Sequence, residues 1–123
     1  MRRWQAVLAI VTGALIIVSA GFHAFAGWPQ FDPILNQSSV PESVIRGLQL
    51  GWYFGSIAML SFGLITLLAG VNGLRSRAAS RISLAVIAAA YVGFGVYAFV
   101  GTGYSPHFLL FIVLGLLAGV SAL

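Results

Sequence analysis

Four long runs of apolar residues alternate along the chain with short segments that hold all of the charged residues. An arginine or aspartate at the centre of a bilayer costs about 2.5–3.5 kcal/mol, so this pattern is typical of a multi-pass membrane protein. About 20 helical residues cross the hydrocarbon layer, and each run approaches this length. The pattern therefore predicts an all-α fold, a four-transmembrane-helix bundle that forms one domain over residues 1–123. The helices are expected at about 5–27, 40–73, 81–102 and 106–122.

The connection 28–39 is predicted to be a loop on the outer side, although its composition is apolar for a segment exposed to water. Its two prolines oppose a continuous helix, while three of its side chains favour burial: Phe31, Ile34 and Leu35. We expect the loop to lie on the membrane surface, and a lid over a ligand site is the alternative. Ser39 and Glu42 fit a capping box, which would start the second helix near residue 40.

The composition mainly excludes classes of protein and kinds of chemistry. The chain is 60% hydrophobic and 7% charged, whereas soluble domains carry about 25% charged residues. A single membrane domain uses the whole length, which leaves no room for a soluble catalytic module. The absence of cysteine excludes disulfides, thiolate metal sites and thiol catalysis. The net charge of +4 lies in short connections, so we attribute it to membrane topology and expect no nucleic-acid partner.

The distribution of arginine predicts the orientation. Five of the six arginines belong to one side of the predicted bundle: Arg2, Arg3, Arg75, Arg77 and Arg81. Arg46 stands on the other side with Asp32 and Glu42. The arginine-rich side should be cytoplasmic, which predicts a cell membrane, the inner one in a bacterium, with both termini cytoplasmic. A cleaved secretory signal ending near 24–26 is the alternative, but the run 6–22 is longer than a usual signal core.

Small residues recur at intervals that allow helix backbones to approach closely. Such contacts matter in a membrane because lipid supplies no hydrophobic drive between helices. Packing within the bundle is the simpler interpretation, and a surface for a second copy or another subunit is the alternative. The predicted packing residues are Gly47, Gly51, Gly55, Ala89, Gly93, Gly115 and Gly119.

The two halves of the chain resemble each other in short segments. Residues 21–27 align with 95–101, and 67–71 match 116–120 residue for residue. These matches suggest a duplicated helical hairpin, although apolar sequences also produce them by chance.

Two histidines are the candidates for ligand chemistry. His23 is the one ionisable side chain within an apolar run, and His107 opens the fourth helix at the same outer depth. Two imidazoles could hold a haem iron or begin a metal site. The simpler alternatives are a His23 hydrogen-bonded to a neighbouring carbonyl or hydroxyl, and a solvated or capping His107. The candidate ligand-binding residues are His23, Tyr97, His107, Trp28 and Asp32.

Reactive groups are otherwise scarce, since two acids and two histidines cannot assemble a catalytic triad or a carboxylate-rich metal site. The sequence therefore favours a non-enzymatic membrane protein that acts through helix packing, as an accessory or assembly subunit or a small oligomer. The alternative is a binder or transporter of a small hydrophobic molecule such as a lipid, a quinone or haem, at an outer-leaflet site near His23 and His107. A channel formed by a symmetric dimer is a third possibility, disfavoured for ions by the sparse polar lining. The lipid bilayer is the expected partner in every case.

Overall fold

The computed structural model describes all of residues 1–123 and contains helices only. The chain forms α1 (Arg3–Phe22), a π-helical turn η1 (His23–Gly27), α2 (Trp28–Asn36), α3 (Glu42–Leu74), α4 (Arg81–Gly101), a 3-10 turn η2 (Pro106–Phe108) and α5 (Leu109–Ala122). The first three elements form one continuous helical rod of 34 residues. Three helical segments are long and apolar enough to cross a membrane, namely Arg3–Asn36, Glu42–Leu74 and Arg81–Gly101. The all-α class is thereby confirmed, and the last apolar segment, Pro106–Ala122, is shorter than these three.

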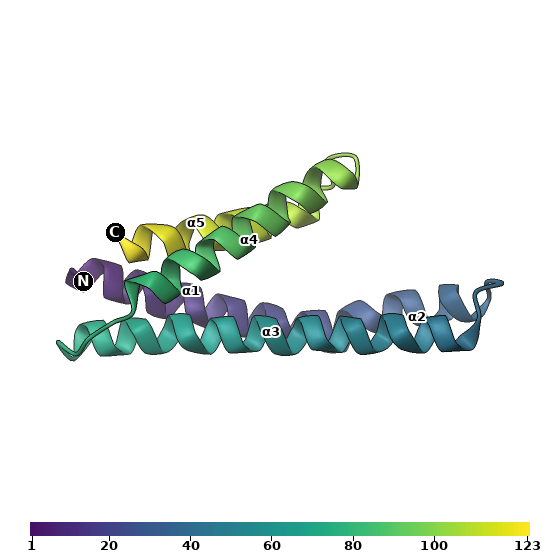
Figure 1. The fold of residues 1–123 in the computed structure, drawn as a ribbon, viewed down its shortest axis with the longest axis horizontal. Helices are drawn as coiled ribbons and strands as arrows, with labels where there is room; N and C mark the ends of the chain where they lie inside the picture. Colours follow the sequence, from purple (N-terminus) through teal and green to yellow (C-terminus); the bar gives the residue numbers. More distant parts are fainter.

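The helices form two antiparallel hairpins, as Figure 1 shows. Hairpin 1 pairs the α1–α2 rod with α3, and hairpin 2 pairs α4 with α5. Both chain ends and the connection between α3 and α4 lie at one end of the molecule, which we call the terminal end (Figure 1). The connections 37–41 and 102–105 lie at the opposite, far end.

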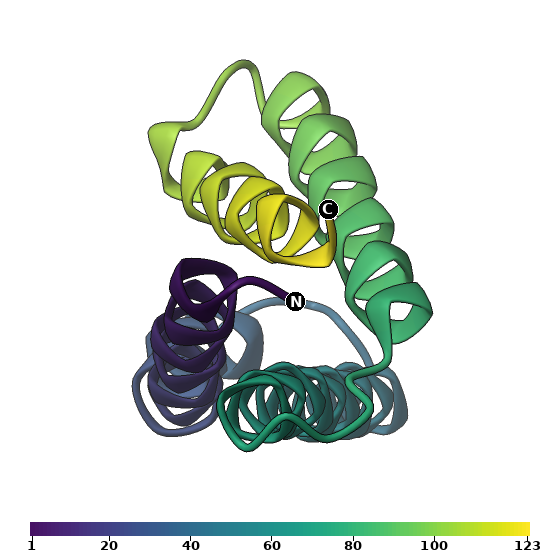
Figure 2. The ribbon, with the colours of Figure 1, turned by 90° about the vertical axis from the view of Figure 1, so that its left-hand side faces the viewer.

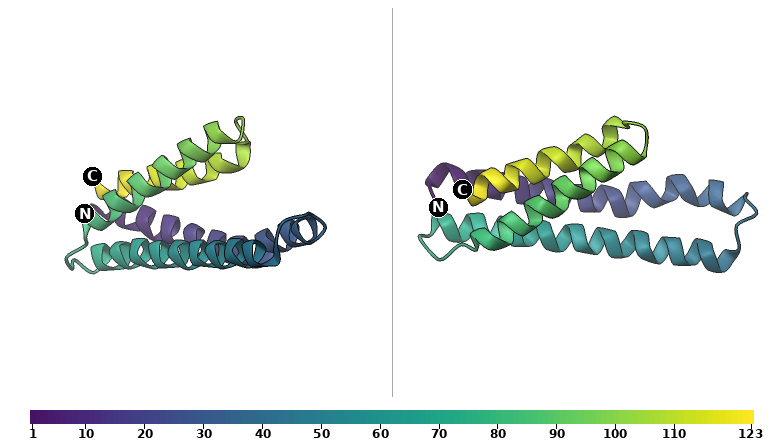
Figure 3. Two further views of the ribbon diagram at one scale, coloured as in Figure 1. Left: turned by 45° about the vertical axis from the view of Figure 1, so that its right-hand side comes forward. Right: turned by 45° about the horizontal axis from the view of Figure 1, so that its top comes forward.

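The hairpins touch near the terminal end and diverge toward the far end. Seen from the terminal end, α5 lies over α1 and α4 lies over α3 (Figure 2). Figure 3 shows the same divergence from two further directions. The core shared by the hairpins consists of five buried residues, against which Phe62 of α3 also packs: Ile16, Ile87, Tyr91, Leu114 and Ala118.

Hairpin 1 is longer than hairpin 2. At 1.5 Å per residue, the 34-residue rod and the 33-residue α3 are each about 50 Å long, whereas the 21-residue α4 spans about 30 Å. Hairpin 1 is thus longer by roughly 20 Å, and it projects beyond hairpin 2 at the far end (Figure 1). The duplication of a helical hairpin remains a prediction. The two aligned segments differ in structure, since residues 23–27 form a π-helical turn and the aligned residues 97–101 of α4 are regularly α-helical.

Glycines bring the backbones of α1 and α3 into direct contact. A Cβ atom added at Gly13 would lie 2.5 Å from the backbone nitrogen of Leu67. One added at Gly70 would lie 2.6 Å from the carbonyl oxygen of Ala6. Since these obstacles are backbone atoms, only glycine permits this separation of the two helices.

The predicted packing residues fall into two groups. Gly115 lies against Val92, where an added Cβ would be 2.8 Å from the backbone nitrogen, and Gly119 and Gly55 have neighbours at ordinary contact distances of 3.4 and 3.7 Å. The remaining four are not packed in this way. No atom lies within 4 Å of a Cβ position at Gly47, Gly51 or Gly93, and Ala89 is exposed. Gly13 and Gly70 take their place at the contact between α1 and α3.

The predicted loop over 28–39 is wrong, because residues 28–36 form α2. Pro29 lies in the first turn of α2, where its missing N–H matters least. Only residues 37–41 form a connection. The predicted capping box is also wrong, since Pro41 is the N-cap of α3 and no side chain caps the helix. A residue before proline avoids the α conformation, so Val40 cannot be helical and the helix begins at Glu42.

Candidate functional site

His23 opens the π-helical turn η1, which interrupts the rod directly before Pro29. Proline lacks the N–H of a regular helix, and its ring crowds the carbonyl of the residue four positions earlier, here Phe25. A wider i→i+5 turn accommodates this crowding without ending the helix, and such turns often mark functional sites. The turn therefore sets the direction of the His23 side chain.

Trp52 of α3 packs into this turn. Its indole Nε1–H donates to the carbonyl oxygen of His23 at 2.6 Å. Its ring stacks on the imidazole of His23 with centroids 4.1 Å apart and planes 5° from parallel. Gly27 admits the indole, since a Cβ there would lie 2.6 Å from Trp52 Cζ2. The indole thus holds both the backbone and the ring of His23.

Ser56, one helical turn after Trp52, forms a hydrogen bond with the ring of His23. Its hydroxyl lies 3.2 Å from the carbonyl oxygen of Trp52 and 2.7 Å from His23 Nδ1. When the hydroxyl proton points to the carbonyl of Trp52, the serine oxygen accepts Nδ1–H from His23; when the hydroxyl donates to Nδ1 instead, the ring proton lies on Nε2. The other ring nitrogen, Nε2, makes no hydrogen bond within the chain, and it carries a free lone pair in the tautomer with the proton on Nδ1. The ring of His23 is therefore held through Nδ1, and Nε2 is left without a partner within the chain.

Two further aromatic rings surround Trp52 in hairpin 1. The ring of Phe31 lies 5.1 Å from the Trp52 ring between centroids, and that of Trp28 lies 6.3 Å from it. Trp28 is 5% exposed, and its indole N–H has no partner within the chain. We call the residues His23, Trp28, Phe31, Trp52 and Ser56 the His23 cluster.

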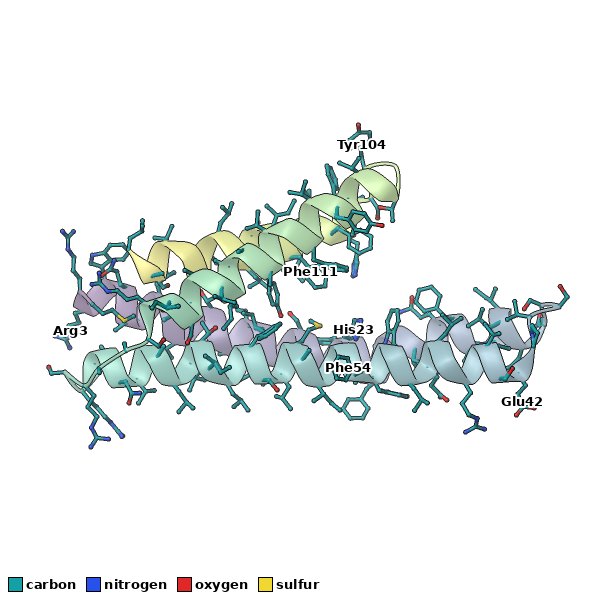
Figure 4. All side chains as sticks on the ribbon, viewed as in Figure 1. Arg3, His23, Glu42, Phe54, Tyr104 and Phe111 are labelled. Carbon is teal, nitrogen blue, oxygen red and sulfur yellow. The ribbon has the colours of Figure 1, made fainter.

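Hairpin 2 presents an aromatic surface opposite the His23 cluster. Figure 4 shows His23 and Phe111 on the facing sides of the two hairpins, whereas Phe54 points away from hairpin 2. The ring of Phe94 lies 5.1 Å from that of Phe111 and 6.2 Å from that of Phe108. The imidazole of His107 meets Phe108 edge to face at 5.4 Å. Phe94 remains 50% exposed.

The structure brings together only part of the predicted ligand-binding set. His23 and Trp28 belong to one cluster, whereas His107 lies in η2 of hairpin 2, with its ring against that of Phe108. Tyr97 is 79% exposed on α4. Asp32 lies on α2, where its backbone carbonyl accepts from Asn36. No group of three or more histidine, aspartate or glutamate side chains forms a metal site.

The sequence interpretation did not identify Trp52 and Ser56, which bind His23 directly. A weak signal for them exists, because a tryptophan and a serine four residues apart share one face of a helix. Nothing in the sequence, however, indicates that this face meets His23, since Ser56 follows it by 33 positions. Comparison of the chain with protein-family models, curated proteins and solved structures gives no match.

The indole N–H of Trp52 should contribute measurably to stability. Trp52→Phe keeps an aromatic ring but removes the donor to His23, and we expect it to lower the free energy of unfolding by about 1–2 kcal/mol. Titration with sodium dodecyl sulfate, followed by circular dichroism, measures this loss. Trp4→Phe is the matched control, because Trp4 is 51% exposed and donates no hydrogen bond, and it should leave the unfolding curve unchanged. Equal losses in both variants would contradict the role of the indole N–H.

Proposed function

We propose that this is a four-span membrane protein that binds a small hydrophobic molecule from the lipid phase, between its two hairpins, with His23 as the polar anchor. The observation that carries this proposal is the fixed imidazole. Trp52 and Ser56 hold its ring and one nitrogen, and Nε2 is left free.

The depth of His23 supports a site reached from the outer leaflet. We place the arginine-rich terminal end in the cytoplasm and both chain ends with it, in the inner membrane of a bacterium. The 20 residues of α1 then span about 30 Å, which brings His23 to the outer edge of the hydrocarbon layer. Trp28 and Trp52 lie at the same level, where membrane proteins concentrate tryptophan.

The chemistry of the walls indicates the class of ligand. Hairpin 2 contributes three phenylalanines packed against one another, Phe94, Phe108 and Phe111, and Phe111 lies on the side that faces His23. Such walls suit an apolar, flat or chain-like molecule with few polar atoms, such as a quinone, haem or lipid. No catalytic group accompanies them, so we propose binding or transfer rather than a reaction.

An accessory or assembly role is the second candidate, and the projection of hairpin 1 favours it. Residues near its tip are apolar and exposed, including Phe31, Ile34 and Leu50. Gly47 and Gly51 face open space on the same hairpin. Affinity purification from the native membrane tests this role. A stoichiometric protein partner or a second copy would support it, and a monomer that carries only lipid or a small molecule would contradict it.

Quenching of tryptophan fluorescence tests the binding function, because Trp52 and Trp28 lie at the site. Purified full-length protein in lipid nanodiscs is titrated with a short-chain ubiquinone, with hemin and with oleic acid. We expect saturable quenching by at least one of them, and a dissociation constant at least tenfold higher in His23→Gln, whose folding is checked by circular dichroism. Absence of saturable quenching by all three, or an affinity unaffected by His23→Gln, would contradict the proposal.

The proposed topology makes a separate prediction. The chain has no cysteine, so single cysteines report the side of the membrane on which they lie. Gln37→Cys and Ser105→Cys at the far end should react with a membrane-impermeant maleimide added outside intact cells. Ala78→Cys at the terminal end should react only after the membrane is opened. Reaction of Ser105→Cys and Ala78→Cys from the same side would contradict four crossings.

A further inference from the structure

A groove lies between α4 and α5, in the half of hairpin 2 nearest the terminal end. The residues that line it are small or branched and all apolar, among them Ala88, Ala89, Gly115, Leu116, Gly119 and Val120. The groove has a volume of about 390 Å³, which lies in the usual range for sites that hold small molecules. Ala89, Leu116 and Val120 are exposed. In a membrane the groove therefore opens toward the lipid.

The groove is nearly as long as one leaflet is deep. On α5 it extends from Gly115 to Leu123, and a helical segment of this length rises about 12 Å. Half of the hydrocarbon layer measures about 15 Å. With the terminal end at the membrane surface, the groove lies at the depth of the acyl chains in the leaflet on that side. A long, thin and apolar acyl chain matches both its direction and its lining.

Arg81 lies at the end of the groove that is closest to the membrane surface. It is the first residue of α4, and its Nη1 donates to the carbonyl oxygen of Leu123, which lines the groove, at 2.9 Å. A guanidinium carries five N–H groups in a planar fork that matches a phosphate. The other N–H groups of Arg81 make no hydrogen bond within the chain. The contact with Leu123 thus holds a cationic donor where the headgroup of a lipid in the groove would lie.

The side-chain charge at the terminal end is entirely positive. Five exposed arginines belong to this end: Arg2, Arg3, Arg75, Arg77 and Arg81. No acidic side chain accompanies them, because Asp32 lies in α2 and Glu42 begins α3 at the far end. The one ion pair of the chain joins Glu42 to Arg46, at 3.9 Å. The arginines of the terminal end therefore lack counter-charges, and an anionic membrane surface supplies them.

From these features we propose that the groove between α4 and α5 binds an acyl chain of an anionic phospholipid in the cytoplasmic leaflet, with Arg81 bound to its phosphate. This site goes beyond the function proposed above, because it shares no residue with the His23 cluster. A second copy of the chain is the other occupant that an apolar groove admits. Two copies in the same orientation would, however, place two sets of arginines without counter-charges side by side.

Native mass spectrometry of the full-length protein in mild detergent tests the site. The protein is titrated with dioleoylphosphatidylglycerol and with dioleoylphosphatidylcholine, which has the same chains but no net charge. We expect one tightly bound phosphatidylglycerol per chain, with a dissociation constant about fivefold lower or more than that of phosphatidylcholine. Equal dissociation constants for the two lipids would overturn the proposal, and so would a dimer that binds neither lipid.

Arg81 and Arg75 provide a matched pair for the binding of the headgroup. Both are exposed arginines of the terminal end, but Arg75 follows α3 in hairpin 1 and is not at the groove. Arg81→Gln should raise the dissociation constant of phosphatidylglycerol about fivefold, whereas Arg75→Gln, which removes the same charge, should change it little. Equal increases would show attraction to the overall charge in place of a site, and would overturn the proposal.

Ala89 and Ala90 provide a matched pair for the groove. Both are exposed on α4, but only Ala89 lines the groove. Ala89→Leu places a larger side chain in the groove and should raise the dissociation constant about fivefold or more. Ala90→Leu adds the same volume outside it and should leave binding unchanged. Circular dichroism checks that both variants fold. An affinity that Ala89→Leu does not alter, or that both variants lower equally, would overturn the proposal.

Discussion

Alanine at both Gly13 and Gly70 is expected to force α1 away from α3 and to lower the free energy of unfolding by about 2–6 kcal/mol, since overpacking costs about 1–3 kcal/mol per site. The added Cβ atoms would lie 2.5 Å from the backbone nitrogen of Leu67 and 2.6 Å from the carbonyl oxygen of Ala6. Backbone atoms in a helix cannot rotate away as a side chain can. The loss is measured by titration with sodium dodecyl sulfate, followed by circular dichroism.

Gly47 and Gly51 provide the matched control for this substitution. They lie in α3 as Gly70 does, but no atom lies within 4 Å of a Cβ at either position. Alanine at both should leave stability unchanged or raise it by up to about 1 kcal/mol per site, because alanine favours the helix more than glycine does. Similar losses in the two double variants would contradict the assigned contact between α1 and α3.

Tyr91→Ala is expected to weaken the contact between the hairpins and to lower the free energy of unfolding by about 3–5 kcal/mol, the usual loss when a buried aromatic side chain is truncated. Tyr91 is 4% exposed and belongs to the shared core. Its ring lies 6.2 Å from that of Phe62 in α3 and 5.7 Å from that of Phe111 in α5. The same unfolding titration measures the loss.

Tyr91→Phe separates the ring from its hydroxyl. The hydroxyl oxygen is buried and has no hydrogen-bond partner within the chain. A buried polar group without a partner costs free energy, so its removal should leave stability unchanged or raise it by about 1 kcal/mol. A loss of stability comparable with that of Tyr91→Ala would show that the hydroxyl, and not the ring, holds the hairpins together.

The helices could be predicted from the sequence because charge and apolar length dominate in a membrane. The runs that become α3 and α4 have clear ends in the sequence. Proline precedes and arginine follows the first run, whereas arginine precedes and proline follows the second. The helix α2 could not be predicted in this way. Two prolines normally argue against a helix, but Pro29 lies in a first turn and the π-helical turn before it relieves the crowding.

The packing glycines show a second limit of the sequence. Gly47 and Gly51 have the spacing typical of packing glycines, yet neither makes a close contact within the chain. Spacing alone does not tell which face of a helix turns toward a neighbour. The contacts at Gly13 and Gly70 set how α1 and α3 are aligned along their length. That alignment decides which residues of α3 lie opposite His23.

The candidate site was accordingly predictable only in part. His23 could be identified because an ionisable residue in an apolar helix is unusual. Its partners Trp52 and Ser56 could not, since they depend on the alignment of α1 with α3 and on the π-helical turn. Tyr97, chosen because it aligns with His23 in the possible repeat, is exposed on α4 and belongs to no cluster.

The proposed function depends most directly on the protonation of the His23 ring, because the position of the ring proton decides whether Nε2 meets a ligand as an acceptor or as a donor. Nitrogen-15 NMR of histidine-labelled protein in nanodiscs at pH 8, with His107→Gln to leave a single imidazole, measures it. We expect a neutral ring with the proton on Nδ1 and a free lone pair on Nε2, and the loss of this state in Ser56→Ala. A proton found on Nε2 would contradict the account.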